Sequence, residues 1–372
     1  MHNDLVRVFG LATGGLLTLA LTLALTLPLV LGSRAVADVA DYPAINVTRV
    51  VASGLDTPWG LAFLPDGSAL VSERDSGKIK RIDPRGRVGT NVTTVGRIKG
   101  VVSAGEGGLL GIAVATPQGS SVPVLFAYLT SRSDNRVVRV QLLKGGKRLG
   151  KQQPIVTRIP KATNHNGGRL LVGTDQTLFI ATGDAGDPQS AQDRGSLSGK
   201  VLRVDFNGRP AAGNPRSGSP VFTLGHRNVQ GLDVDGKGRV WASEFGERDA
   251  DELNLLVPGG NYGWPLFEGR GKDARFINPV TVWSPTSTAS PSGIAIKNDV
   301  VYVASLRGER LWQVPIRGAK TRKAKSWVLG DRGRLRTIVL APGGSFWVIT
   351  SNTDGRGSPR FKDDKIIQLS IR

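Results

Sequence analysis

The sequence predicts an all-β fold, a six-bladed β-propeller built of four-stranded antiparallel blades. Its 49 glycines are spread between short apolar runs, which is typical of many strands joined by tight turns. One strand pattern recurs six times at intervals of about fifty residues, the periodicity of propeller blades. No long, well-periodic helix pattern follows residue 37, so α/β architectures are disfavoured.

Each repeat begins with a short apolar strand, passes through a Gly-containing turn into a second strand, and continues into a strand that alternates basic and apolar residues. The six opening strands are expected at residues 59–63, 111–114, 169–172, 231–234, 293–296 and 337–340. A further strand at residues 45–51 precedes the first repeat. We expect it to complete the last blade and close the ring, because closure leaves no sheet edge exposed.

The sequence divides into three predicted parts: a signal peptide or N-terminal membrane anchor over residues 1–37, a short linker over 38–44, and the propeller over 45–372. Arg7 precedes an apolar stretch at residues 11–32, and Ala35-Val36-Ala37 forms a small-x-small pattern that suits signal peptidase. The apolar stretch is long enough to stay uncleaved as an anchor, although Pro28 weakens it as a spanning helix. We therefore expect an exported protein, periplasmic or extracellular, with membrane association through this segment if it is not cleaved.

The charge balance favours an anionic partner, because 49 Lys and Arg face 30 Asp and Glu and give a net charge of +19. Two basic clusters, at residues 144–148 and 317–325, have no interleaved aromatic side chains to stack on bases. Together with the export signal, this disfavours nucleic acid as the partner. Cysteine is absent, so any metal must use oxygen or histidine ligands.

Two histidines of the predicted propeller are candidates for acid–base chemistry, since His2 lies in the predicted signal. His165 lies in a polar, Gly-rich segment just ahead of a predicted inner strand, where a propeller directs residues toward its central cavity. The alternative is a histidine that only satisfies loop backbone groups. His226 stands in the same position ahead of the next inner strand, followed by Arg227 and Asn228.

Two other patterns indicate charged ligands. Residues 245–252 hold four carboxylates and a Gly-rich segment at 259–265 follows, so hard oxygen ligands on flexible backbone suit calcium. A solvated acidic turn accounts for the same composition equally well. Arginines also recur at equivalent ends of the last two repeats, at residues 307–310 and 334–336, and converging arginines imply a polyanionic ligand. A solvated charged face is the alternative.

Five motifs in order resemble the soluble glucose/sorbosone dehydrogenases that depend on pyrroloquinoline quinone (PQQ), with the aldose sugar dehydrogenases as the nearest branch. The motifs are PWGLAF at 58–63, GEGGLLG at 105–111, NHNGGR at 164–169, GHRN at 225–228 and GGNYGWP at 259–265. The resemblance extends from about residue 45 to the end. It implies a six-bladed propeller that binds PQQ and Ca²⁺. The implied reaction is oxidation of the C1 hydroxyl of aldose sugars to lactones, by hydride transfer to the quinone. The electrons then pass to an acceptor that the sequence does not identify.

The resemblance also implies roles for individual residues. His165 corresponds to the general base. Contacts to the cofactor are implied for Glu106, Arg227, Asn228, Arg307, Arg334 and Arg336. Calcium ligands are implied at Gly246 and Glu247, through backbone carbonyls beside the cofactor, and at Glu252 and Tyr262 in a second site. The family often has Gln in place of Glu106 and Pro in place of Glu247. A carboxylate at residue 106 is expected to repel a cofactor carboxylate unless an arginine or calcium intervenes.

Two other functions remain open from the sequence. A calcium-dependent sugar lactonase uses the same fold, but its metal lies on the propeller axis among Glu, Asn and Asp ligands, where this sequence has arginines. A non-catalytic propeller that binds carbohydrate or another partner would not need His165 and the arginine set together. Fold alone does not decide between these functions.

Overall fold

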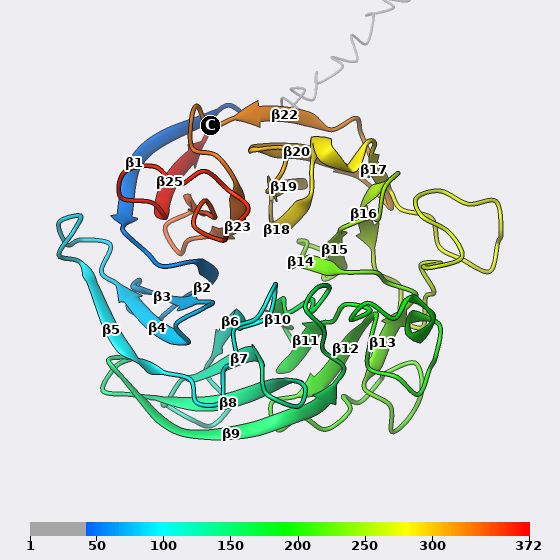
Figure 1. Cartoon of the computed structure of the whole chain (residues 1–372), viewed down its shortest axis with the longest axis horizontal. Helices are drawn as coiled ribbons and strands as arrows, with labels where there is room; N and C mark the ends of the chain where they lie inside the picture. The colour runs from blue at the N-terminus through cyan, green and yellow to red at the C-terminus, as the bar shows by residue number, and fades with distance from the viewer. Residues whose placement is uncertain (1–41) are drawn as a thin grey trace, which may run out of the picture. The chain divides into compact units, whose positions relative to one another are not determined.

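Six antiparallel sheets follow one another around a central axis in the computed structural model, which describes residues 42–372 (Figure 1). The predicted six-bladed, all-β propeller is confirmed. The predicted signal peptide or anchor at residues 1–37, and residues 38–41 of the predicted linker, lie outside the described residues. No helix within residues 42–372 is long and apolar enough to cross a membrane.

The first three blades each contain four strands. Blade 1 consists of β2 (Pro58–Phe63), β3 (Ala69–Glu73), β4 (Lys78–Ile82) and β5 (Val92–Arg97). Blade 2 consists of β6 (Leu109–Ala115), β7 (Val124–Thr130), β8 (Asn135–Leu143) and β9 (Arg148–Ile159). Blade 3 consists of β10 (Leu170–Val172), β11 (Thr177–Ala181), β12 (Lys200–Asp205) and β13 (Val221–Leu224).

The last three blades complete the ring, and a 3₁₀ turn precedes one of them. Blade 4 consists of β14 (Val229–Val234), β15 (Val240–Glu244), β16 (Asp251–Leu255) and β17 (Thr281–Trp283). Blade 5 consists of β18 (Pro291–Lys297), β19 (Val300–Ser305), β20 (Arg310–Arg317), β21 (Lys320–Thr321) and β22 (Lys325–Val328). Blade 6 consists of β23 (Leu335–Leu340), β24 (Phe346–Thr350), β25 (Lys365–Ile371) and β1 (Ile45–Ser53). Short 3₁₀ turns lie at Pro188–Ala191 and Thr286–Thr288.

Blade 5 differs from the predicted four strands, because its outer position is divided between two short strands. Both β21 and β22 pair with β20, one beyond the other along its length. The ring closes as the sequence predicts: β1 pairs antiparallel with β25, with Ile45 opposite Ile371. In Figure 1 the N-terminal strand and the C-terminal strand accordingly lie side by side.

The core is divided among six apolar clusters, one between each pair of neighbouring blades in the described residues. Successive side chains of a strand point to opposite faces of its sheet, so each blade contributes to the clusters on both sides. In β24, Phe346 and Val348 pack toward blade 5, whereas Trp347 and Ile349 pack toward blade 1. The strands are therefore buried on both faces, which explains their continuous apolar runs.

Strand direction determines where functional residues can meet. Because neighbouring strands alternate in direction, the loops ahead of the six inner strands lie at the same end of the ring as the loops between the second and third strands of the blades. Both sets of loops supply the residues of one central cavity, which is described below.

Inner strands approach one another closely at glycine positions. A Cβ atom on Gly231 of β14 would lie 2.3 Å from the Ser292 carbonyl oxygen of the next blade and 2.4 Å from Ser243 Oγ. Gly236 lies in the turn that follows β14, and a Cβ atom there would meet nothing within 4 Å.

We predict that Gly231→Ala destabilises the propeller by about 1–3 kcal/mol, because the methyl group forces two blades apart. Gly236→Ala, in the same blade, should leave stability unchanged or raise it by up to about 1 kcal/mol. Chemical unfolding followed by circular dichroism measures both changes. Equal stabilities for the two variants would show that the fold tolerates a methyl group where Gly231 approaches the next blade.

Candidate functional site

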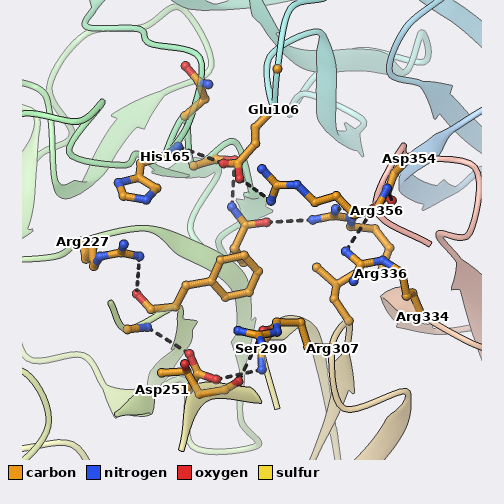
Figure 2. A pocket seen from close by; sticks show the side chains of 18 of the residues that line it. Glu106, His165, Arg227, Asp251, Ser290, Arg307, Arg334, Arg336, Asp354 and Arg356 are labelled. Carbon is orange, nitrogen blue, oxygen red and sulfur yellow. Dashed lines mark hydrogen bonds and ion pairs between the residues drawn. The ribbon is translucent and has the colours of Figure 1, made fainter. Parts of the chain in front are cut away.

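Loops at one end of the ring line a central cavity of about 370 Å³. Figure 2 shows side chains from several blades directed toward it. The structure brings together eight of the predicted site residues there: Glu106, His165, Arg227, Gly246, Glu247, Arg307, Arg334 and Arg336. Asn228, Glu252 and Tyr262 do not line this cavity in the described residues. Most of the predicted site residues, which come from six separate segments of the sequence, therefore lie around one cavity.

His165 lies at the wall of the cavity, and a buried carboxylate fixes its imidazole ring. Its Nδ1 lies 2.8 Å from Asp184 Oδ1. Asp184 is fully buried and accepts two further hydrogen bonds, from Trp264 Nε1 and from the Gly186 amide, each at 2.9 Å. A carboxylate can only accept here, so Nδ1 carries the proton and Nε2 is the basic nitrogen. Within the described residues Nε2 has no hydrogen-bond partner.

Asp184 was missed by the sequence analysis. It lies in the polar, Gly-rich segment at residues 182–187 that follows β11, in the same blade as His165. This segment resembles the His165 segment in composition, and because β10 and β11 are antiparallel it lies at the same end of the ring. That similarity is the signal that could have identified it.

The backbone of His165 is held in an uncommon conformation, with φ of +52°. Its amide donates to Glu106 Oε2 at 2.9 Å, and its carbonyl accepts from the Ala185 amide at 3.1 Å. Gly183 allows the loops to meet, since a Cβ atom there would lie 1.9 Å from the His165 carbonyl oxygen. Surrounding contacts therefore maintain the conformation that directs the ring to the cavity.

Glu106 does not present a bare charge to the cavity. Its Oε1 accepts from Arg356 Nη1 at 2.7 Å, while Oε2 binds the His165 amide. Arg356 belongs to the loop between β24 and β25, and 61% of its side chain is exposed. Of the two groups expected to offset the charge of Glu106, an arginine or calcium, the structure shows an arginine, and Arg356 was not among the predicted site residues.

Arg334 and Arg336 share a single acidic partner. Asp354 Oδ2 lies 3.2 Å from Arg334 Nη2 and 3.5 Å from Arg336 Nη2, and all three side chains are almost entirely buried. Burial lowers the pKa of Arg336 to about 10. Burial alone would raise the pKa of Asp354, but the charges of the two arginines, together with hydrogen bonds from the Arg356 amide and the Ser351 hydroxyl, outweigh it, and the pKa lies below its ordinary value. Two guanidinium groups against one carboxylate leave an excess of buried positive charge.

The cavity as a whole fits a polyanionic ligand. Six arginines line it against four carboxylates: Arg74, Arg227, Arg307, Arg334, Arg336 and Arg356 against Glu106, Glu247, Asp251 and Asp354. In the described residues the buried Nε atoms of Arg227, Arg334 and Arg336 have no hydrogen-bond partner. Buried donors are normally satisfied, so these three guanidinium groups keep hydrogen-bonding capacity that the described residues do not use.

The predicted residues of the second calcium site lie beside a separate cavity of only about 10 Å³, next to the first. Burial, with Glu244 as the next cause, raises the pKa of Glu252 to about 8. Its oxygens accept from the Gly269 amide at 2.7 Å and from Asn254 Nδ2 at 2.9 Å. In residues 42–372 no group of three His, Asp or Glu side chains is placed to hold a metal ion.

The hydroxyl of Tyr262 is already committed to the backbone. It donates to the Leu255 carbonyl at 2.7 Å and accepts from the Val257 amide at 2.9 Å. Any contribution of Tyr262 to a metal site would therefore come from its carbonyl oxygen.

His226 and Asn228 are fully buried, unlike Arg227 between them, which lines the cavity. His226 Nδ1 lies 2.8 Å from Glu244 Oε2, and its Nε2 lies 2.8 Å from Thr223 Oγ1. With both ring nitrogens bonded and no exposed surface, His226 cannot take a proton from a molecule in the cavity. Asn228 Oδ1 accepts from the Gly167 amide at 3.1 Å and so supports the His165 segment.

The chain is similar to several known proteins. The family model described as Glucose / Sorbosone dehydrogenase matches residues 55–361. A solved structure of the PQQ-bound form of aldose sugar dehydrogenase from Streptomyces coelicolor is 48% identical, covers 89% of this chain and 99% of its own, and has a TM-score of 0.85.

Two curated relatives are similar over less of their sequence. Quinoprotein glucose dehydrogenase B of Acinetobacter calcoaceticus is 31% identical over 61% of this chain and 54% of the relative. Aldose sugar dehydrogenase YliI of Escherichia coli is 27% identical over 86% of this chain and 94% of the relative.

We predict that His226→Ala lowers the free energy of unfolding by about 3 kcal/mol, because the buried carboxylate of Glu244 and the Thr223 hydroxyl lose their partner. His165→Ala should cost less, since its ring is partly exposed and Asp184 keeps two other donors. Denaturant unfolding of both variants measures the difference. A more stable His226 variant than His165 variant would contradict this account of the two histidines.

Proposed function

The chain belongs to the glucose/sorbosone dehydrogenase family, and on that premise we propose that it oxidises the C1 hydroxyl of aldose sugars to lactones, with PQQ as cofactor and His165 as general base. The observation that carries the proposal is the His165–Asp184 pair at the wall of an arginine-lined cavity. An oriented imidazole beside a site for a polyanion is what this reaction needs from the protein.

The arginines would hold the cofactor. PQQ carries three carboxylates, and the cavity offers an excess of guanidinium groups with unpartnered buried Nε atoms. We assign the carboxylates to Arg307, Arg334 and Arg336. When bound, PQQ supplies an electrophilic quinone that accepts hydride from the sugar. The lactonase alternative would instead place Glu, Asn and Asp side chains on the axis, where this cavity has arginines.

His165 would remove the proton of the sugar's C1 hydroxyl through Nε2. Asp184 holds Nδ1–H, which keeps the ring in the tautomer that leaves Nε2 basic and stabilises the imidazolium once the proton has been taken. Glu106 and the Ala185 amide hold the backbone on either side of the ring in place. The departing proton therefore has a fixed acceptor whose orientation is independent of the substrate.

Arg227 would stabilise the negative charge that develops on the oxygen atoms at the reacting end of the cavity. Its guanidinium lies over the Trp264 ring, 5.3 Å from the centroid, and its amide is bound by Glu244. The backbone is thus anchored while the charged end lines the cavity. A preorganised donor of this kind contributes most when water is excluded.

Calcium would bind beside the cofactor through the carbonyl oxygens of Gly246 and Glu247, both of which line the cavity. A second ion would lie near Glu252 and the Tyr262 carbonyl, where the small cavity is also lined by Glu244 and Glu268.

We also propose that the chain is exported and that residues 45–372 form the catalytic propeller. An aldose sugar is the substrate, and a separate acceptor reoxidises the cofactor. The apolar stretch and small-x-small pattern within residues 1–37 support export. The same segment, if uncleaved, would provide membrane association. Nothing in the basic clusters favours nucleic acid as a partner.

We predict that His165→Ala lowers kcat by about 10²- to 10⁴-fold, because the general base is lost, while PQQ binding is retained. Dye reduction by a panel of aldoses in the presence of PQQ and calcium measures the rate, and absorbance measures the bound cofactor. Lys161→Ala, an exposed change in the same loop, is the control and should keep full activity. Near-full turnover by the His165 variant would refute its assignment as the base.

We predict that replacing Arg334 and Arg336 together by Ala weakens PQQ binding by several kcal/mol, since each charge-assisted hydrogen bond contributes about 1.5–3 kcal/mol. Calorimetric titration with PQQ in excess calcium measures the affinity. The matched control replaces Arg85 and Arg87, two exposed arginines in the turn between β4 and β5. If both double variants bind PQQ equally well, the buried arginines do not hold the cofactor.

A further inference from the structure

One carboxylate oxygen organises the loop between β15 and β16. Glu268 Oε1 accepts hydrogen bonds from four successive backbone amides, at 2.7, 2.9, 2.9 and 3.0 Å for residues 247, 248, 249 and 250. The preceding amide, of Gly246, donates to Asp251 Oδ1 at 3.0 Å. Five consecutive amides are therefore bound by only two carboxylates. Glu268 itself comes from the separate segment between β16 and β17.

The direction of these amides fixes the direction of the carbonyls. In a planar trans peptide the C=O of one residue and the N–H of the next point in opposite directions. The amides of Glu247 and Arg248 point to Glu268, so the carbonyls of Gly246 and Glu247 point away from it. Both residues line the central cavity, whereas Glu268 lines the small cavity behind them.

The loop closes tightly around this carboxylate. A Cβ atom on Gly246 would lie 2.5 Å from Glu268 Oε1 and 2.1 Å from the Ala250 carbonyl oxygen. A residue with a side chain therefore cannot occupy position 246 without displacing Glu268 or opening the loop. Residues 247–249 are exposed and bury no apolar side chain, so the carboxylate is their main attachment to the fold.

We propose that Glu268 is a positioning residue for the calcium ion beside the cofactor, because it holds the carbonyls of Gly246 and Glu247 as a preformed pair of ligands. This inference rests on the proposed function, in which those two carbonyls bind calcium. A hard cation prefers oxygen ligands that already point into its site, since their ordering then costs nothing at binding. Glu268 acts on the ion beside the cofactor through the backbone, because its own side chain faces the small cavity of the second proposed site and not the central cavity.

The charges around the loop support this arrangement. Glu268 and Asp251 together place two carboxylates behind one short loop. A divalent cation on the carbonyl side of the loop would offset this negative charge across the width of one peptide unit.

The test compares Glu268→Gln with Glu309→Gln in the purified protein without added PQQ. Glu309 is an exposed residue in the β19–β20 loop at the same end of the ring, so the control makes the same chemical change there. Hydrogen exchange of the amides of residues 247–250 reports loop order, and calorimetry with CaCl₂ reports calcium affinity. We expect Glu268→Gln to exchange these four amides at least tenfold faster and to bind calcium at least tenfold more weakly. Glu309→Gln should match the wild type in both.

A second variant covers the case in which Glu268→Gln perturbs the fold. Gly246→Ala keeps the carboxylate but excludes it from the loop, and it should shift exchange and calcium affinity in the same direction. Wild-type exchange and calcium affinity in Glu268→Gln would overturn the positioning role and leave the proposed function intact. Absence of PQQ-dependent sugar oxidation by the wild type, with the loop effects as expected, would overturn the proposed function alone.

Discussion

The pairing of β1 with β25 is the interaction on which the rest of this structure depends. It joins the first strand to the last blade, so that every blade of the described chain buries both faces against a neighbour. The apolar cluster between blades 6 and 1 exists only if the ring is closed. The site depends on the same closure, because its residues come from loops of all six blades and meet only when the ring holds those loops around one axis.

Electrostatics then determines what the centre of the ring can bind. Arg334 and Arg336 share Asp354, and the buried Nε atoms of these two arginines and of Arg227 have no hydrogen-bond partner in the described residues. Burying such an excess of positive charge is unfavourable in the free protein. A ligand with several carboxylates would relieve it, so the affinity for the ligand and the cost to the free protein have the same origin. Glu106 contributes one negative charge to the same cavity, and its ion pair with Arg356 neutralises that charge.

The two histidines show how equivalent sequence positions acquire different roles. Each lies just ahead of an inner strand and each is paired with a carboxylate through Nδ1. The difference lies in the surroundings of Nε2: Thr223 occupies it in His226, whereas His165 presents it at the cavity wall. The acidic partner orients the ring in both cases, but only the exposed nitrogen can take part in chemistry.

The sequence by itself determined the six-fold strand repeat, the closing role of the N-terminal strand, and the candidacy of His165 and the late arginines. These features are written in local patterns: apolar periodicity, Gly-rich turns and residues repeated at the ends of strands. Only the tertiary structure decided which groups complete the site. Glu106 and Arg356 are separated by 250 positions, and Glu268 meets its loop about twenty residues away across an intervening strand. No local pattern encodes such partners, because their contacts arise from how the closed ring brings distant loops together.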